Sequence, residues 1–249
     1  MSNYNKVSLP KKIGGLLFFT LSLTSCASVD VKSDKAAIAN SDLGIRYLQA
    51  GRLQLANEKL LKALDQSPNS PVANHYFAIL QQRLGNTNKA NQYYGKAVSL
   101  DPKNPEIRNN YGQYLCDNGK PQQAIQQLKT AINDPLYRTP EFAYTNVGIC
   151  LRKTGNDAEA EKYFRNALRK KSSYPSALLE MAGLYSDRKK YPRAQAFMSR
   201  YESVGKSSPK ALELCSIINQ KMDDIAKSEN CKSTLLRLFP NSDEAQRVI

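Results

Sequence analysis

The sequence contains no Trp and a single His, His75, among its 249 residues. A metal centre built on imidazole ligands needs at least two His, and a Ser-His-Asp triad would have to use His75. The sequence also lacks the G-x-S-x-G, H-E-x-x-H and phosphate-binding glycine-loop motifs. These absences argue against an enzyme, and we expect no cofactor and no metal.

Acidic side chains are scarce relative to basic ones, with 22 Asp and Glu against 36 Lys and Arg. Because 41% of the residues are hydrophobic, the chain is too apolar to be wholly disordered. A mean hydropathy of −0.55 is too low for a protein with several membrane spans. The positive charge favours acidic partners or anionic surfaces, although a solvated basic surface accounts for most of it.

No apolar run is long enough to span a bilayer, because the longest, residues 13–23, has eleven residues and a span needs about 20. Three Lys and no acid precede this run, as in a secretory signal. The run ends at Leu23, and the stretch Leu23-Thr24-Ser25-Cys26 resembles the lipobox of bacterial lipoproteins. The alternative is an ordinary secretory signal followed by a chance Cys.

The lipobox resemblance implies a signal peptide over residues 1–25 and acylation of Cys26, with the membrane bound through the acyl chains. Ala27 follows Cys26, which by resemblance to Gram-negative sorting rules implies the outer membrane, facing the periplasm. Loss of residues 1–25 removes three Lys and leaves a net charge of +11. An exported protein does not meet the chromosome, so we expect no nucleic acid partner. The small, polar residues 26–36 predict a flexible tether.

The rest of the chain repeats with a period of 34 residues. The first four units have a small residue at position 8, Gly at 15, Ala at 20, a large apolar residue at 24 and Ala at 27, and three of the six units have Pro at 32. Four units follow the pattern fully and the last two are degenerate, with Lys189 replacing the Gly of the fifth. The units are 37–70, 71–104, 105–138, 141–174, 175–208 and 209–242.

This pattern resembles the tetratricopeptide repeat, and it predicts an all-α, right-handed superhelical solenoid of about six repeats over residues 37–242, with a C-terminal tail at 243–249. Apolar positions 4, 7, 8 and 11 mark one helix, and positions 20, 24 and 27 mark a second. Gly at 15 permits a left-handed end to the first helix. A small residue at 8 is expected to face Ala at 20. Units that cannot bury their apolar stripes alone stack on their neighbours.

Four Cys follow Cys26, and the oxidising periplasm favours their pairing. Cys116 and Cys150 lie on the first helices of adjacent units, and Cys215 and Cys231 face each other within the last unit. This placement predicts the disulfides Cys116–Cys150 and Cys215–Cys231. The alternative is that these residues are reduced and buried in the core.

The concave face of such a solenoid is where proteins bind, and first-helix positions 2, 5, 9, 12 and 13 are expected to point into it. There the sequence predicts an apolar floor beside polar side chains, suited to a segment of a protein partner. The alternative is that these side chains form the core between repeats. We expect a monomer whose groove contains Ile45, Leu48, His75, Ile79, Asn109 and Gln113.

Units four and five are strongly basic. This charge favours docking of an acidic surface, and the alternative is a basic face that is only solvated. The basic residues concerned are Arg165, Arg169, Lys170, Lys171, Arg188, Lys189, Lys190 and Arg193.

A lipobox followed by about six such repeats resembles the PilF/PilW family of type IV pilus biogenesis lipoproteins. The stretch Asn109-Asn110-Tyr111-Gly112-Gln113-Tyr114-Leu115-Cys116 and the pair Cys116 and Cys150 carry the resemblance. It implies an outer-membrane pilotin that binds a secretin subunit and promotes its localisation and multimerisation. The alternative is a general periplasmic scaffold that docks peptidoglycan enzymes.

Overall fold

The computed structural model describes residues 1–2 and 26–248, with side chains from residue 35 onward in the second range. The predicted signal peptide, apart from Met1 and Ser2, and the side chain of Cys26 therefore lie outside the described residues. Within that part of the chain the structure contains thirteen α-helices and no strand. They are α1 (Cys26–Gln49), α2 (Leu53–Gln66), α3 (Pro71–Arg83), α4 (Thr87–Leu100), α5 (Pro105–Asp117), α6 (Pro121–Ile132), α7 (Pro140–Lys153), α8 (Asp157–Lys170), α9 (Pro175–Asp187), α10 (Tyr191–Glu202), α11 (Pro209–Lys221), α12 (Ile225–Leu238) and α13 (Asp243–Val248).

The helices follow one another in pairs, and each of the six 34-residue units contains one pair. A second helix packs on its own first helix and on the first helix of the next unit. Most successive first helices also contact each other, as α5 and α7 do. The prediction of an all-α solenoid is confirmed.

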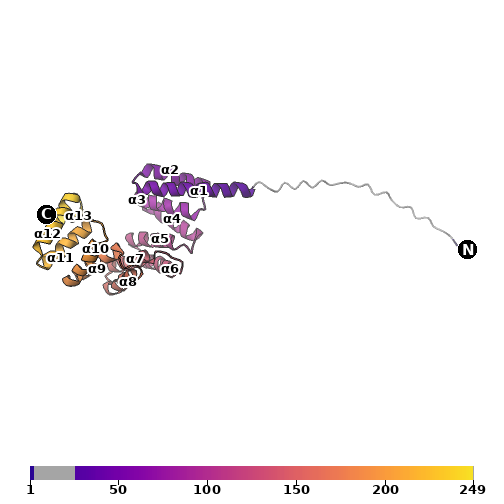
Figure 1. Cartoon of the computed structure of the whole chain (residues 1–249). Helices are drawn as coiled ribbons and strands as arrows, with labels where there is room; N and C mark the ends of the chain where they lie inside the picture. Colours follow the sequence, from indigo (N-terminus) through magenta and orange to yellow (C-terminus); the bar gives the residue numbers. More distant parts are fainter. Residues whose placement is uncertain (3–25, 249) are drawn as a thin grey trace.

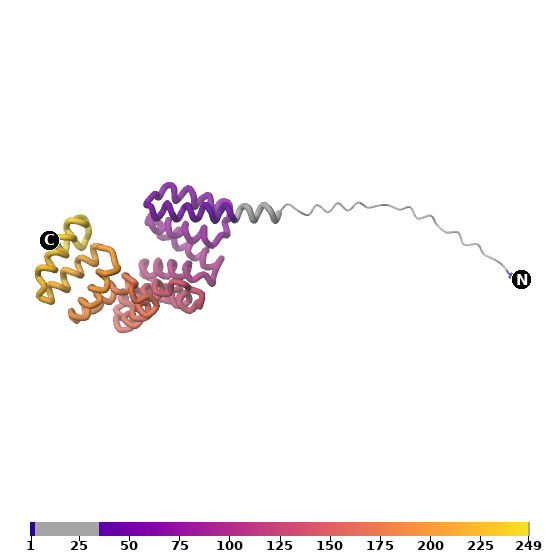
Figure 2. The backbone as a smooth tube through the Cα atoms, in the orientation of Figure 1, coloured from indigo at the N-terminus to yellow at the C-terminus, as the bar shows by residue number. Residues whose placement is uncertain are grey.

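The pairs stack into a curved array, seen in Figures 1 and 2 as an arc from α1 to α13. In its middle part α5 and α7 lie inside the arc and α6 and α8 outside it. In this middle part the inner surface of the arc is therefore built from first helices, as the repeat pattern predicts.

Three first helices, α3, α5 and α11, begin where the sequence places a capping side chain before proline. Ser70 Oγ accepts a hydrogen bond from the Ala73 amide, and Asn104 and Ser208 cap α5 and α11 in the same way. Proline at the first helical position loses no hydrogen bond, because its amide would be unpaired there. These caps and prolines fix where α3, α5 and α11 start.

The two helices of a unit approach most closely at repeat position 8. A Cβ on Gly112 would lie 2.6 Å from Leu128 Cγ and 3.1 Å from the Ala124 carbonyl oxygen. Gly44 stands in the same relation to Leu60, and Gly148 to Phe164. The small residue therefore lies against the large side chain at position 24, and in unit three also against the backbone of Ala124 at position 20, as expected.

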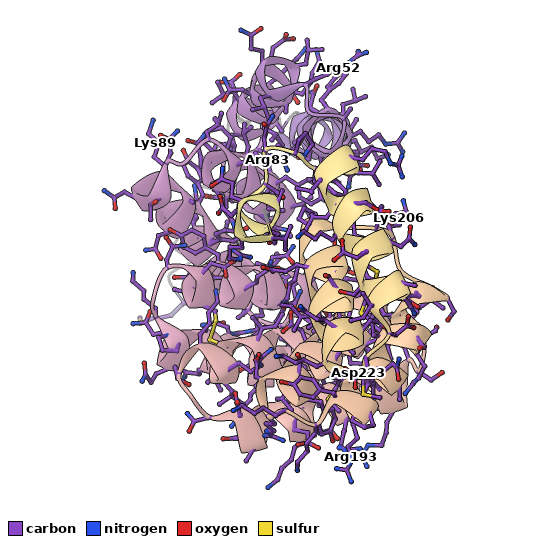
Figure 3. All side chains as sticks on the ribbon, turned by 90° about the vertical axis from the view of Figure 1, so that its left-hand side faces the viewer. Arg52, Arg83, Lys89, Arg193, Lys206 and Asp223 are labelled. Atoms are coloured by element: carbon purple, nitrogen blue, oxygen red, sulfur yellow. A yellow bond between two sulfur atoms is a disulfide. The ribbon has the colours of Figure 1, made fainter. Side chains whose placement is uncertain are left out.

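The first helix of each unit ends in a left-handed residue at position 15. The φ angles of Gly51, Gly85, Gly119 and Gly155 lie between 72° and 79°. In the two degenerate units Lys189 (φ 56°) and Asp223 (φ 60°) adopt the same conformation without glycine. Asp223 is labelled at its turn in Figure 3. The repeat geometry therefore persists where its sequence signature is lost.

Two expectations about the ends of the solenoid were wrong. Residues 26–36 were expected to form a flexible tether, but α1 begins at Cys26 and includes them. Residues 243–249 were expected to form a tail, but 243–248 form α13, which packs on α11 and α12 and buries Ala245 completely. None of the helices described is long and apolar enough to cross a membrane.

We predict opposite effects for two glycine substitutions. Gly112→Ala should lower the free energy of unfolding by about 1–3 kcal/mol, because the new methyl group overlaps Leu128 and the α6 backbone. Gly95→Ala, within α4 and with no atom near the added Cβ, should raise it by roughly 0.5–1 kcal/mol. Urea denaturation of the three proteins measures both changes. Equal effects at the two sites would contradict the close approach at position 8.

The left-handed Lys189 gives a second prediction. Lys189→Gly should stabilise the protein by roughly 0.5–1 kcal/mol, because relief of the left-handed strain exceeds the added backbone entropy of the unfolded chain. Lys190, with a φ of −93°, is the matched control, and Lys190→Gly should bring no gain. Thermal unfolding of both variants provides the measurement, and a gain from Lys190→Gly would refute the explanation.

Candidate protein-binding groove

A hollow of about 490 Å³ opens on the first-helix side of units one to three; we call it the N-terminal pocket. The side chains come from α1, α3, α4 and α5, which the stacking of three units brings together. The pocket is lined by Leu48, Ile79, Gln82, Arg83, Tyr94, Asn110 and Gln113.

The floor of the N-terminal pocket is apolar. Leu48 is 95% buried and belongs to a core cluster with Leu60 and Leu80. Ile79 is half-buried and packs against that cluster, as does Ile45. Leu48 and Ile79 therefore serve both as core and as floor, while Ile45 contacts the core without lining the pocket.

A chain of polar side chains runs beside the pocket across three first helices. His75 Nε2 on α3 lies 2.9 Å from Asn110 Nδ2 on α5. Asn110 Oδ1 accepts from Asn109 Nδ2 at 3.3 Å. Asn109 Oδ1 in turn accepts from Asn146 Nδ2 on α7 at 3.0 Å. We call these four residues the polar ladder.

The polar ladder is internally paired and largely buried. His75 and Asn109 are each 5% exposed, so they support the groove from behind instead of lining it. Asn110 alone belongs both to the ladder and to the pocket wall. Burial lowers the pKa of His75 to about 4, which keeps the ring neutral at pH 7 so that Nε2 accepts the amide proton of Asn110.

Tyr94 lines the pocket, and two further tyrosine rings pack against it. Tyr94 is 1% exposed, and its ring centroid lies 5.5 Å from that of Tyr111 and 5.1 Å from that of Tyr114. Its hydroxyl donates to Gln82 Oε1 at 2.9 Å, which holds Gln82 at the rim. The sequence pattern had assigned Tyr94 to the core at position 24 and gave no sign of this second role.

Of the six predicted groove residues, Leu48, Ile79 and Gln113 line the N-terminal pocket. Ile45, His75 and Asn109 lie next to it. Tyr94 and Asn110 were missed as lining residues. First-helix spacing identifies the inner face of α5 but not which of the adjacent Asn109 and Asn110 reaches the pocket.

Two disulfides join the four cysteines of the solenoid, visible as yellow bonds in Figure 3. Cys116–Cys150 connects α5 to α7, with Cα atoms 5.7 Å apart. Cys215–Cys231 connects the two helices of unit six, with Cα atoms 6.0 Å apart. These are the pairs expected from the repeat frame, and the first links the same two helices as the Asn109–Asn146 hydrogen bond. The described residues contain no group of three or more His, Cys, Asp or Glu that would hold a metal ion.

Comparison with known proteins identifies tetratricopeptide repeats at residues 93–126 and, through a second family of the same description, at 77–104 and 143–170. The type IV pilus assembly protein PilF of Pseudomonas aeruginosa is 29% identical over 239 residues, covering 93% of this chain and 95% of the relative. The solved structure of P. aeruginosa PilF superposes with a TM-score of 0.75 at 30% identity, covering 87% of this chain and 97% of that one. The chain belongs to the PilF/PilW family of type IV pilus proteins.

The solved structure of PilW, described as a widely conserved type IV pilus biogenesis factor, superposes on this chain as well as the structure of PilF does. The TM-score is 0.75 at 28% identity, over 85% of this chain and 97% of PilW. The family resemblance and the tetratricopeptide fold are therefore confirmed, and the chain is a type IV pilus biogenesis protein of the tetratricopeptide class.

The buried His75 makes stability depend on pH. Its pKa is 6.5 when unfolded and about 4 when folded, so the unfolded chain binds more protons between these values. The contribution of His75 is fully present above about pH 6.5 and is lost as the pH falls toward 4, by up to about 3 kcal/mol.

His75→Gln keeps an acceptor for Asn110 and removes the titration. In urea denaturation from pH 7 to pH 4, the native protein should lose more stability than this variant, by up to about 3 kcal/mol. Carboxylates titrate equally in both proteins, so parallel curves would contradict a neutral, buried His75.

Proposed function

We propose that the protein is a lipid-anchored component of the outer membrane that binds a subunit of the type IV pilus secretin through the N-terminal pocket. Binding promotes localisation of the secretin and its assembly into a multimer. The observation that carries the proposal is the N-terminal pocket, together with membership of a pilus biogenesis family.

The chemistry of the pocket suits one short segment of a partner. Leu48 and Ile79 offer an apolar floor for one or two aliphatic or aromatic side chains. Gln82, Gln113 and Arg83 at the rim provide donors for main-chain carbonyls or a carboxylate. A small apolar centre with a polar rim is the arrangement that concentrates binding energy in a few anchors.

The proposed anchor at Cys26 gives this pocket its place of action. Acyl chains at Cys26 would hold the solenoid at the periplasmic surface of the outer membrane. A secretin subunit captured in the pocket would then have a raised local concentration at that surface. This arrangement favours subunit–subunit contact there without any catalytic step.

The test uses one residue at the same repeat position in two units. Ile79 is position 9 of unit two, and Ile217 is position 9 of unit six and 40% exposed. We expect Ile79→Asp to reduce recovery of the secretin in pull-downs from detergent-solubilised membranes at least about tenfold, because it places a charge on the apolar floor. Ile217→Asp should recover the secretin normally. Mass spectrometry identifies the bound proteins, and thermal unfolding checks that both variants fold.

Recovery of the secretin by a folded Ile79→Asp protein would refute binding through the N-terminal pocket. Recovery of peptidoglycan enzymes in place of the secretin would refute the secretin proposal and assign the protein to the scaffold class.

A further inference from the structure

A second hollow, about 450 Å³ in volume, lies between the second helices of units four and five; we call it the outer basic pocket. It lies on the second-helix side of the solenoid, and α8 lies outside the arc in Figure 1. Its lining comes from α8 and α10 and contains four cations and no acid. The lining residues are Lys162, Arg165, Asn166, Leu168, Arg169, Phe197 and Arg200.

Most of the positive charge in this pocket is uncompensated. Arg165 binds Glu161 at 2.8 Å, and Glu161 is also bound by Arg188 at 2.5 Å. Within the described part of the chain, no carboxylate oxygen lies within 4.0 Å of a cationic nitrogen of Lys162, Arg169 or Arg200. Three charges therefore face the pocket without an ionic partner.

Neutral groups hold two of these three side chains in position. Arg200 Nη2 donates to the Ser172 carbonyl at 2.8 Å, and its guanidinium lies 5.5 Å from the Phe197 ring centroid. Arg169 donates to Asn166 Oδ1. A side chain held in this way loses less conformational freedom when it binds an anion.

The floor of the outer basic pocket is apolar. Leu168 and Phe197 are half-buried and pack against the core of units three to six. Phe197 stacks on Tyr185 with ring centroids 5.6 Å apart. The pocket thus combines an apolar base with a cationic rim, which fits a ligand that has an anionic head and an apolar body.

We propose that the outer basic pocket binds the phosphate headgroups of anionic phospholipids, so that the solenoid rests on the membrane to which it is tethered. This inference depends on the proposed lipid anchor, and it concerns a surface separate from the partner groove. Guanidinium groups bind phosphate oxygens in a bidentate manner, and the glycerol and first acyl carbons would contact Leu168 and Phe197.

Three arguments favour a membrane over an acidic protein. The pocket lies on the second-helix side of the solenoid. A flat bilayer can contact a convex surface, but it cannot contact the concave surface formed by the first helices. The chain after residue 25 carries a net charge of +11, which attracts an anionic leaflet. An acyl anchor at Cys26 would hold the solenoid where the local concentration of lipid is high. Two attachments would fix the solenoid's orientation on the bilayer.

The test measures binding of the unlipidated full chain, Cys26→Ser, to phospholipid vesicles by co-sedimentation. The vesicles are phosphatidylcholine alone or with about one-third phosphatidylglycerol, and the readout is the gain in affinity that the anionic lipid brings. All variants share residues 1–36, so binding through that segment is common to them. We expect Arg169→Glu/Arg200→Glu to reduce this gain at least about tenfold, and Arg169→Gln/Arg200→Gln to reduce it less.

The matched control carries the same charge change elsewhere. Lys89 and Lys206 are exposed and project from opposite edges of the molecule in Figure 3. Lys89→Glu/Lys206→Glu should keep most of the gain that the native pocket shows. Circular dichroism verifies that each variant folds, and the glutamine pair keeps the test valid if the glutamate pair does not fold.

An equal loss in the pocket and control variants would overturn the proposal, because net charge alone would then explain binding. Absence of any gain with phosphatidylglycerol would overturn it as well. If the pocket substitutions leave vesicle binding unchanged but abolish recovery of the secretin in the pull-down, the pocket binds an acidic protein. That outcome would also refute the membrane role. Neither of the first two outcomes bears on secretin capture in the N-terminal pocket, which the Ile79 and Ile217 variants test.

Discussion

The absence of a bulky side chain at repeat position 8 determines how each helix pair is built. Where Gly112 lies against Leu128, a single added carbon would sit 2.6 Å from the leucine, closer than carbon atoms pack. The glycine therefore lets a large side chain at position 24 fill the space between the helices. With that space filled, the remaining apolar side chains of the pair are left to pack against the neighbouring unit. Stacking, curvature and the inner surface all follow from this local contact.

Curvature then brings together residues that lie one repeat apart. His75 contacts Asn110, and Asn109 contacts Asn146, across separations of 35 and 37 residues. The polar ladder forms only when units two, three and four are correctly stacked, because each of its members comes from a first helix of one of them. A buried polar group without its partner is costly. The ladder therefore ties the geometry of the groove to the geometry of the stack.

Much of the fold was predictable because the repeat pattern encodes contacts within a unit. Gly51, Gly85, Gly119 and Gly155 identify the left-handed helix ends from sequence alone. Contacts between units depend on the rotation of one pair against the next, which no spacing within a unit specifies. Asn146 as the partner of Asn109, and Tyr94 as a wall of the pocket, follow from that rotation. The terminal helix α13 was missed because only Ala245 among its six residues is buried, which leaves no recognisable apolar period.

Covalent linkage is distributed unevenly along the solenoid. Among the described residues, Cys116–Cys150 is the disulfide that joins two different units, while Cys215–Cys231 lies within one. When such a stacked array is pulled, its interfaces open one by one as packed side chains separate. The disulfide Cys116–Cys150 holds the interface between units three and four closed, next to the two-residue insertion at Thr139 and Pro140. A pulling force applied between the two ends of the solenoid would therefore extend the other interfaces first and leave this one intact.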